Sequence, residues 1–236
     1  LNYWTESRCS KATFDESSQQ WEVEVIRKGE KLTLRPTQLV FTTGAYGPPK
    51  KIPIKGKKKF KGQIFHSSEY QDGRDFKGKR CVVVGSATSA HDICQDLWEC
   101  GAKSVTMVQR SSSIIIKSET LQEYGFGELY SEQALKNGVT TDKADLLFAS
   151  LPYKLVPDDH TEVYRQMYEH DKEFYDQLQE SGFKFDFGED GSGLLMRALR
   201  TASGYYIDVG ASELIIQKKI KLKTCLLYTS DAADDW

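Results

Sequence analysis

Three features of the sequence predict an α/β fold with a parallel sheet and flanking helices. A strand-like apolar run at Arg80–Val84 ends abruptly in the small residues of Gly85–Ala90. A segment with helical periodicity follows, and Ser104–Gln109 then has the composition of a second strand. Because strand–helix–strand crossovers are right-handed, the two strands are expected to be parallel.

The predicted helix has a single apolar face. Its apolar residues recur at helical spacing and are Ala90, Ile93, Cys94, Leu97 and Trp98. This stripe is expected to pack on the sheet. Gly101 has the position of a glycine that ends a helix.

The N-terminal segment predicts a different arrangement. Trp21–Ile26 alternates apolar and charged residues, and Arg27–Lys31 supplies a turn into Leu32–Leu34, so a hairpin is expected. Gln38–Gly44 is expected to form a short buried strand, and the glycine and prolines of 47–49 then end regular structure.

Charge and hydropathy exclude two classes of partner. The 236-residue chain has 32 basic and 34 acidic residues and a net charge of −2, which does not suit a nucleic-acid or anionic membrane surface. The lysine-rich segment Lys50–Lys61 is expected to be a solvated linker, not a polyanion site. No apolar run is long enough to span a membrane, so we expect small-molecule partners.

The C-terminal half predicts helices and short strands. Val163–Leu178 has the pattern of one long amphipathic helix, and its aromatic stripe is expected to be packing. Leu194–Leu199 predicts a short helix, and Tyr205–Lys223 predicts several short strands.

Isolated polar residues outside these elements give weak signals. Asp92 is expected to face solvent on the helix after the turn, and His160 and His170 are expected to be surface residues. The acids of the glycine-rich segment lack EF-hand spacing, which favours a polar turn over a calcium loop; they are Asp186, Glu189 and Asp190. No metal site is expected.

The cysteines and the chain ends give further expectations. The cysteine count is odd and no CxxC spacing occurs, which favours a reducing, cytoplasmic location; the residues are Cys9, Cys81, Cys94, Cys100 and Cys225. The chain does not begin with Met, and residues 225–236 resemble translated cloning sequence. We therefore expect a fragment that lacks both ends of its parent.

The turn at Gly85–Ala90 indicates a dinucleotide site. Pyrophosphate is bound by backbone amides at a helix N-terminus, and Gly85 keeps the first glycine of the GxGxxG pattern. Ala87 and Ala90 replace the other two glycines with the smallest side chain. Hydroxyl donors to phosphate are expected from Ser86, Thr88 and Ser89. By the motif alone, a simple strand-to-helix turn stays open as an alternative.

The end of the second strand indicates which dinucleotide binds. NAD sites usually have an acid there, whereas this chain has Gln109–Arg110–Ser111. The Arg110 guanidinium and the Ser111 hydroxyl suit a 2′-phosphate, so NADP(H) is expected. A surface role for Arg110 is the alternative.

Four residues between the two strand regions carry a family resemblance. Phe60, Gly62, His66 and Tyr70 have the spacing FxGxxxHxxxY, which resembles the fingerprint of flavin-containing monooxygenases and the related Baeyer–Villiger monooxygenases. Leu39–Gly44 resembles the family's "ATG" strand, and Gly85–Ala90 resembles its GxGxSA turn.

The resemblance implies two Rossmann-like domains, one for FAD and one for NADP(H). Residues 1–48 would be the C-terminal remnant of the FAD-binding domain, and 49–79 the linker that carries the fingerprint. Residues 80–224 would be the NADP-binding domain with a helical insertion, and 225–236 a non-native tail. The glycine-rich FAD turn is not found upstream, so we expect this chain alone to be inactive.

The resemblance also implies an activity for the parent enzyme. NADPH would reduce FAD, O₂ would form a flavin C4a-hydroperoxide, and one oxygen atom would pass to N or S of a small organic substrate. Insertion into a ketone is the Baeyer–Villiger alternative, although the ending Tyr70–Gln71 is closer to flavin-containing monooxygenases. Residues that contact substrate would lie in Ser112–Thr201.

The family's motifs assign roles to single residues. Catalytic candidates are His66 and Tyr70, which with the rest of the fingerprint would shape the hinge between domains. Cofactor-binding candidates are Gly44, Phe60, Gly62, Gly85, Ser86, Ala87, Thr88, Ser89, Ala90, Arg110 and Ser111.

Two further readings stay open. A flavoprotein disulfide reductase shares the layout but requires a redox CxxC, and Cys94 and Cys100 have the wrong spacing. A non-catalytic NADP-binding module is the other, because the flavin half is incomplete.

Overall fold

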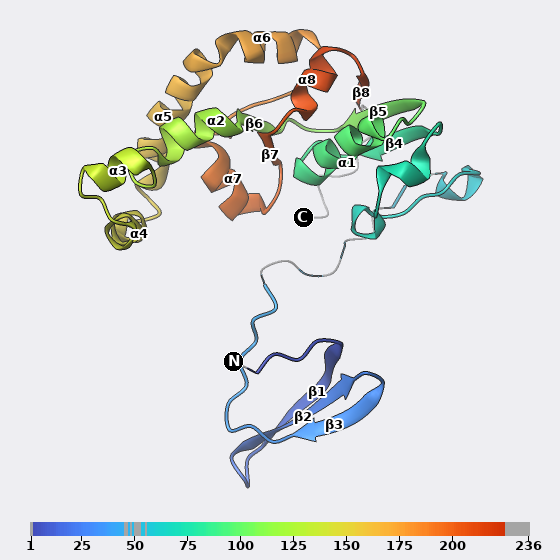
Figure 1. The fold of residues 1–236 in the computed structure, drawn as a ribbon, viewed down its shortest axis with the longest axis vertical. Coiled ribbons are helices and arrows are strands. Elements are labelled where there is room, and N and C mark those ends of the chain that lie inside the picture. Colours follow the sequence, from blue (N-terminus) through green and yellow to red (C-terminus); the bar gives the residue numbers. More distant parts are fainter. Residues whose placement is uncertain (1, 45–46, 48, 50–52, 55, 225–236) are drawn as a thin grey trace. The chain divides into compact units, whose positions relative to one another are not determined.

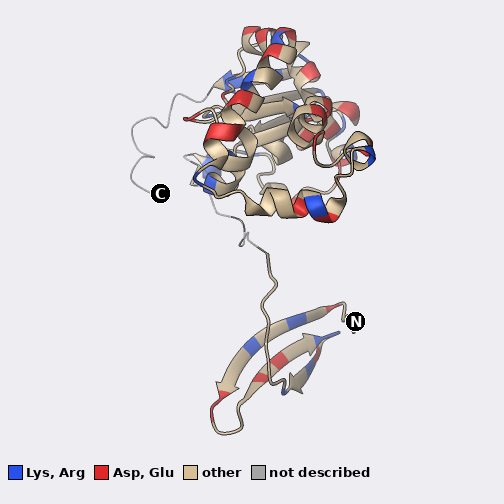
Figure 2. Cartoon of the chain, turned by 90° about the vertical axis from the view of Figure 1, so that its left-hand side faces the viewer, with Lys and Arg blue, Asp and Glu red and all other residues tan. Residues whose placement is uncertain are grey.

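The computed structural model describes residues 2–44, 47, 49, 53–54 and 56–224 and divides the chain into two compact units. The units are Leu1–Gly56 and Lys57–Trp236 (Figure 1). Basic and acidic residues are interspersed along the ribbon of both units (Figure 2), in keeping with the small net charge.

The N-terminal unit is a three-stranded antiparallel sheet in the order β1-β2-β3 (Figure 1). Its strands are β1 (Ser7–Asp15), β2 (Gln20–Arg27) and β3 (Glu30–Leu34). The predicted hairpin is confirmed as β2–β3, and Lys28 and Gly29 both have the positive φ that favours a tight turn. β1 gave no sequence signal, because it is polar and nearly all its residues are exposed.

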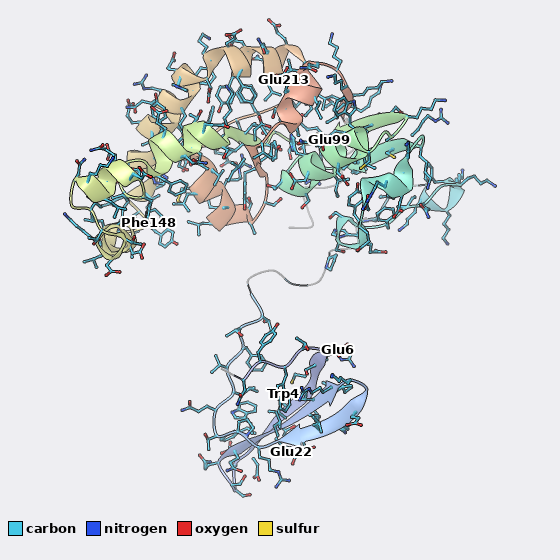
Figure 3. All side chains as sticks on the ribbon, viewed as in Figure 1. Trp4, Glu6, Glu22, Glu99, Phe148 and Glu213 are labelled. Atoms are coloured by element: carbon cyan, nitrogen blue, oxygen red, sulfur yellow. The ribbon has the colours of Figure 1, made fainter. Side chains whose placement is uncertain are left out.

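A cation–π contact joins Arg27, at the end of β2, to Trp4. The Arg27 guanidinium carbon lies 4.4 Å from the ring centroid of Trp4, which is labelled in Figure 3. Such a contact at an exposed site contributes about 0.5–1 kcal/mol. It ties the segment before β1 to the end of β2.

The strand predicted at Gln38–Gly44 is wrong. The segment has no regular structure, and Val40 and Phe41 are 76% and 70% exposed. A strand is stable only when neighbouring strands take up its backbone hydrogen bonds. Among the described residues no strand pairs with this segment, so its β-forming composition has no effect.

The second unit contains two parallel sheets, which confirms the predicted α/β class. One has the order β4-β5-β8, formed by Arg80–Val84, Ser104–Gln109 and Ile220–Thr224. The other pairs β6 (Ile114–Lys117) with β7 (Tyr205–Asp208). The strand–helix–strand order β4-α1-β5 is the one that the sequence predicts, and the strands are parallel.

Helices cover these sheets (Figure 1). They are α1 (Thr88–Glu99), α2 (Ser118–Thr120), α3 (Glu132–Lys136), α4 (Thr141–Ser150), α5 (Val156–His170), α6 (Lys172–Glu180), α7 (Gly193–Thr201) and α8 (Ala211–Ile216). Three short 3-10 turns, η1 (Lys57–Lys59), η2 (Ser67–Glu69) and η3 (Gly73–Phe76), precede β4, and η4 (Leu121–Phe126) is a π-helical segment. The predicted helix at Leu194–Leu199 is confirmed as part of α7.

The predicted apolar stripe of α1 is confirmed with one exception. Cys94 and Leu97 are buried against β5 and β8, but Trp98 is 36% exposed. The Trp98 ring lies outside the core, with Lys219 Nζ 4.8 Å from the ring centroid. Helical spacing alone does not distinguish the edge of an apolar face from its centre.

The single long helix predicted at Val163–Leu178 is wrong, because the structure has α5 and α6 with a break at Asp171. Asp171 is 5% exposed, and its carboxylate accepts hydrogen bonds from Lys117 Nζ at 2.9 Å and from the Thr120 hydroxyl. The helix ends where this carboxylate turns inward to its partners. The predicted packing role of the aromatic stripe is confirmed, since its inward members are buried; they are Tyr164, Met167, Tyr175 and Leu178.

The prediction of strands throughout Tyr205–Lys223 is wrong at its centre, where the chain forms α8. Asp208 Oδ1 accepts hydrogen bonds from the backbone N–H groups of Gly210 at 3.2 Å and Ser212 at 3.1 Å. The carboxylate thus satisfies amides that a helix N-terminus leaves unpaired. These hydrogen bonds support the start of α8 between β7 and β8.

No helix in the described part of the chain is both long enough and apolar enough to cross a membrane. The cytoplasmic location expected from the cysteines stays a prediction.

The segment before β4 packs closely on α1. The Gly73 N–H donates to Asp96 Oδ2 at 2.8 Å, and a Cβ at Gly73 would lie 2.7 Å from the Asp96 carbonyl oxygen. Only glycine therefore allows η3 to approach the helix at this point.

Gly73→Ala is expected to lower the free energy of unfolding of the second unit by about 1–3 kcal/mol, because the new methyl group overlaps backbone atoms of α1. Urea denaturation followed by circular dichroism measures this loss. Gly47→Ala is the control, since a Cβ there meets no atom within 4 Å. Equal stability of the two variants would contradict the prediction.

Candidate functional site

The candidate site is the turn that joins β4 to α1, and its first residue fixes its shape. Gly85 has φ = +133°, a conformation that side-chain-bearing residues rarely adopt, and its N–H donates to the Val108 carbonyl of β5 at 3.0 Å. A Cβ at Gly85 would touch the Ala90 Cβ at 3.6 Å. Gly85 therefore supplies the backbone conformation, and Ala90 keeps the helix close to the strand.

The N-terminus of α1 offers backbone donors. Ala87 is the N-cap residue and makes no side-chain capping hydrogen bond. The first amides of a helix have no intrahelical acceptor, so those of Thr88 and Ser89 point out of the helix end. Uncapped amides, the helix dipole and small side chains together fit a phosphate group.

The hydroxyls expected to assist phosphate are in different environments. Ser86 Oγ lies 2.9 Å from Ser113 Oγ, and Thr88 Oγ1 donates to the Tyr205 carbonyl at 2.9 Å. Ser89 is exposed to solvent at the start of the helix. The structure thus presents Ser89 outward, while Ser86 and Thr88 bind other parts of the protein.

Arg110 and Ser111 follow β5 at the same edge of the sheet as the turn. Val84 is paired with Val108, so both strands end together, and Arg110 and Ser111 are exposed just beyond. Their neighbour Gln109 is 1% exposed and has a structural role. Its side-chain amide donates to the Lys184 carbonyl and accepts from the Lys184 N–H, both at 2.8 Å.

The structure places His66 in a local turn. Its Nδ1 accepts a hydrogen bond from the Ser68 N–H at 3.1 Å, and Glu69 completes a capping box around η2. The residue is exposed. The ring therefore stabilises the fingerprint segment, and its proposed part in catalysis stays a prediction.

Tyr70 anchors the same segment to α1. Its hydroxyl donates to Asp96 Oδ2 at 2.6 Å, and its ring stacks on Phe76 with centroids 5.8 Å apart. Burial, with the Asp96 carboxylate second, raises the pKa of the Tyr70 hydroxyl. Asp96 lies two turns along α1 from Thr88, roughly 12 Å by helical rise, so the structure does not bring this hydroxyl to the turn.

The other fingerprint and linker residues also lie apart from the turn in sequence. Phe60 is 61% exposed, and its ring covers Gly62, where a Cβ would lie 2.6 Å from ring atom Cε1. Gly44 belongs to the N-terminal unit, is exposed and has φ = +81°. Their cofactor contacts stay predictions.

His91 lies beside the candidate turn, and the sequence offered no reason to select it. It is fully buried at the start of α1, stacked on the Tyr206 ring at 4.1 Å, and its Nδ1 lies 3.1 Å from the Ala87 carbonyl oxygen. Burial lowers the pKa of His91 to about 4. The only feature of the sequence that could have indicated its burial is its position next to Ala90, a member of the apolar stripe.

The remaining polar candidates are explained by local contacts. Asp92 is exposed, as predicted. His160 is half-buried and not fully exposed, and this burial lowers its pKa. His170 is exposed, and its Nδ1 lies 3.4 Å from Asp171 Oδ1. In the glycine-rich segment, Asp186 and Asp190 form ion pairs with arginines of α7, at 2.6 Å and 2.7 Å respectively.

The chain is similar to a family of oxidoreductases and to proteins named as monooxygenases. A profile of the family described as "Pyridine nucleotide-disulphide oxidoreductase" matches residues 16–188, more than half of the chain. The probable indole-3-pyruvate monooxygenase YUCCA10 of Arabidopsis thaliana is 34% identical over 59% of this chain and 37% of its own. The trimethylamine monooxygenase of Methylocella silvestris is 33% identical over 43% of this chain and 23% of its own.

The chain is also similar to solved structures. A crystal structure titled as OTEMO in complex with FAD and NADP is 30% identical, with a TM-score of 0.39, over 47% of this chain and 21% of that one. Both curated relatives are monooxygenases by name, which agrees with the resemblance found in the sequence. The chain spans 37% of the first relative's length and 23% of the second's.

Tyr70→Phe is expected to lower the free energy of unfolding by about 1–2 kcal/mol, because Asp96 loses a charge-assisted hydrogen bond in a half-buried site. Urea denaturation measures the change. Tyr130→Phe is the matched control: its hydroxyl also donates to a carboxylate, Asp145 at 2.9 Å, but at an exposed position. A loss as large in the control as in Tyr70→Phe would refute the anchoring role.

His91→Phe is expected to make the free energy of unfolding less dependent on pH below about pH 7. The unfolded His91 titrates near 6.5 and the folded one near 4, so between these values only the unfolded state takes up the proton. Unfolding free energy therefore falls as pH drops, by about 2 kcal/mol from pH 7.5 to 4.5. Urea midpoints across this range measure the slope, with His170→Phe as the exposed control. An unchanged slope in His91→Phe would contradict the assignment.

Proposed function

The chain belongs to the pyridine nucleotide-disulphide oxidoreductase family, and from this premise we propose that it is the NADP(H)-binding part of an FAD- and NADPH-dependent monooxygenase. The named relatives are monooxygenases, and the ordered motifs of the sequence support the same class. Because the chain spans only part of those relatives, the activity is proposed for the parent protein.

The observation that carries the proposal is the turn after β4. Gly85, with its positive φ, leads the chain into an uncapped helix N-terminus between two parallel strands. The amides of this N-terminus bind the pyrophosphate of the dinucleotide, and Ala87 and Ala90 leave room for it. Ser89 adds a hydroxyl at the exposed start of the helix.

Selection of NADP(H) over NAD(H) is assigned to the residues after β5. Arg110 and Ser111 are exposed at the strand end, where the adenosine ribose of a bound dinucleotide would lie. A guanidinium binds a dianionic phosphate through charge-assisted hydrogen bonds, and a hydroxyl donates one more. An acid at this position would repel the 2′-phosphate, and this strand end has none.

The dinucleotide and flavin would supply hydride transfer and activation of O₂, which the protein's own side chains do not provide. The chain's residues bind and orient the dinucleotide. Gly44, Phe60 and Gly62 are proposed cofactor contacts, and His66 and Tyr70 are proposed to shape the segment between cofactors. N- or S-oxygenation of a small molecule is the proposed reaction, and ketone insertion is the alternative.

A disulfide-reductase activity is not supported by the described cysteines. Such enzymes need two paired, reactive thiols. Cys94 is fully buried, and burial raises its pKa to about 12, while the pKa of Cys100 is also raised. Both shifts disfavour the thiolate form that disulfide exchange requires.

Arg110→Ala is expected to raise the Kd for NADP⁺ about tenfold and to leave the Kd for NAD⁺ within about twofold, because only NADP⁺ carries the 2′-phosphate. Isothermal titration of the full chain with both nucleotides measures the two constants. Arg165→Ala is the control, since this arginine is exposed on α5 and pairs with Glu162. The proposed function is wrong if the unmutated chain does not discriminate between NADP⁺ and NAD⁺.

A further inference from the structure

The carbonyl of Ser86 in the candidate turn is held by a serine from outside it. Ser113 is 2% exposed, and its hydroxyl donates to the Ser86 carbonyl oxygen at 2.6 Å. Ser86 Oγ also lies 2.9 Å from Ser113 Oγ. Because the single hydroxyl hydrogen of Ser113 is directed at the carbonyl, Ser86 is the donor in the second contact. The Ser86 hydroxyl is therefore occupied within the protein.

This contact fixes the direction of the neighbouring amide. The C=O and N–H of a trans peptide point in opposite directions, and no described peptide is cis. The Ser86 carbonyl and the Ala87 N–H belong to the same peptide group. With the carbonyl drawn inward to Ser113, the Ala87 N–H must point away from it.

A second side chain holds the next peptide group. The Ala87 carbonyl accepts hydrogen bonds from the amides of Ala90 and His91 at 2.9 Å and 3.1 Å, and it lies 3.1 Å from His91 Nδ1. A carbonyl oxygen only accepts, so Nδ1 carries the hydrogen and donates it. The Thr88 N–H, in the same peptide group as this carbonyl, points out of the helix end.

His91 itself is held in place by β7. Its ring is parallel to that of Tyr206 within 6°, and the Tyr206 hydroxyl oxygen accepts from the backbone amide of Val209 at 3.1 Å. Thr88 Oγ1 donates to the carbonyl of the preceding residue, Tyr205. His91 Nε2 is buried and has no hydrogen-bond partner among the described residues, so Nδ1 makes the ring's one polar contact.

We propose that Ser113 and His91 are positioning residues for the dinucleotide: they hold the Ser86 and Ala87 carbonyls inward, so that the Ala87 and Thr88 amides form a preformed donor pair for pyrophosphate. This inference rests on the proposed function. Two amides aimed before binding reduce the ordering that binding would otherwise require. The Ser86 hydroxyl acts in this network and not on the phosphate.

Ser113→Ala tests the proposal with two ligands. NADP⁺ carries the pyrophosphate, whereas 2′-AMP carries only the 2′-phosphate that Arg110 is proposed to bind. Loss of the Ser113 hydroxyl lets the Ser86–Ala87 peptide rotate, so the Kd for NADP⁺ is expected to rise about fivefold to tenfold. The Kd for 2′-AMP is expected to stay within about twofold. Ser113→Thr keeps the hydroxyl and is expected to restore NADP⁺ affinity.

Ser181→Ala is the matched control. Its hydroxyl also donates to a backbone carbonyl at 2.6 Å from a partly buried position, but at the end of α6. Both alanine variants are expected to lose similar thermal stability, and only Ser113→Ala is expected to lose NADP⁺ affinity. Isothermal titration and thermal denaturation of the full chain give the two readouts.

His91 variants provide an independent measurement should Ser113→Ala fail to fold. His91→Phe keeps the stacked ring and removes the donor, so the Kd for NADP⁺ is expected to rise while that for 2′-AMP is unchanged. His91→Asn keeps a donor close to the position of Nδ1 and is expected to bind NADP⁺ more tightly than His91→Phe.

The outcomes separate this inference from the function on which it rests. If the unmutated chain binds neither NADP⁺ nor 2′-AMP, both are overturned. If it binds both, and the Ser113 and His91 variants change neither constant or weaken both ligands equally, the positioning role alone is overturned. A selective loss of NADP⁺ affinity with rescue by Ser113→Thr supports it.

Discussion

The geometry of the candidate site depends on the backbone of Gly85. Its φ of +133° directs the chain from β4 into α1, and its N–H bonds to the Val108 carbonyl of β5. This single residue therefore joins the two strands and the helix that carry the candidate site. A residue with a side chain would be strained in this backbone conformation. The orientation of the first amides of α1 follows from this junction.

The sequence predicted the elements whose patterns can be recognised within a short window. α1 and β5 have regular apolar periodicity, and small residues in the turn indicate a close approach of backbone to ligand. The β2–β3 hairpin is likewise encoded by its alternating strands and its Lys28–Gly29 turn. The placement of Arg110 at the strand end also follows from chain order, because parallel strands expose their carboxyl ends at one edge.

The errors occur where a distant partner decides the outcome. Gln38–Gly44 has strand composition but no strand beside it, and Asp171 ends α5 because Lys117 and Thr120 draw its carboxylate inward. His91 is buried because Tyr206 and Phe183, which are distant in sequence, supply aromatic rings around it. None of these partners lies within a sequence window that shows periodicity. The sequence therefore specifies them only through the folded structure.

Phosphate binding at the turn likewise depends both on the local sequence and on residues distant from it. The small residues at 85, 87 and 90 allow a close approach, but they do not determine which way each peptide group faces. That direction depends on whether each carbonyl has a donor. The Ser86 carbonyl has the hydroxyl of Ser113 beyond β5, and the Ala87 carbonyl has the amides of Ala90 and His91 together with His91 Nδ1, whose ring is held by β7. A glycine-rich motif with two alanine replacements can consequently keep a phosphate site when the surrounding fold orients its amides. Conversely, an intact motif without such donors would have to order its peptide groups as the ligand binds, which would reduce affinity.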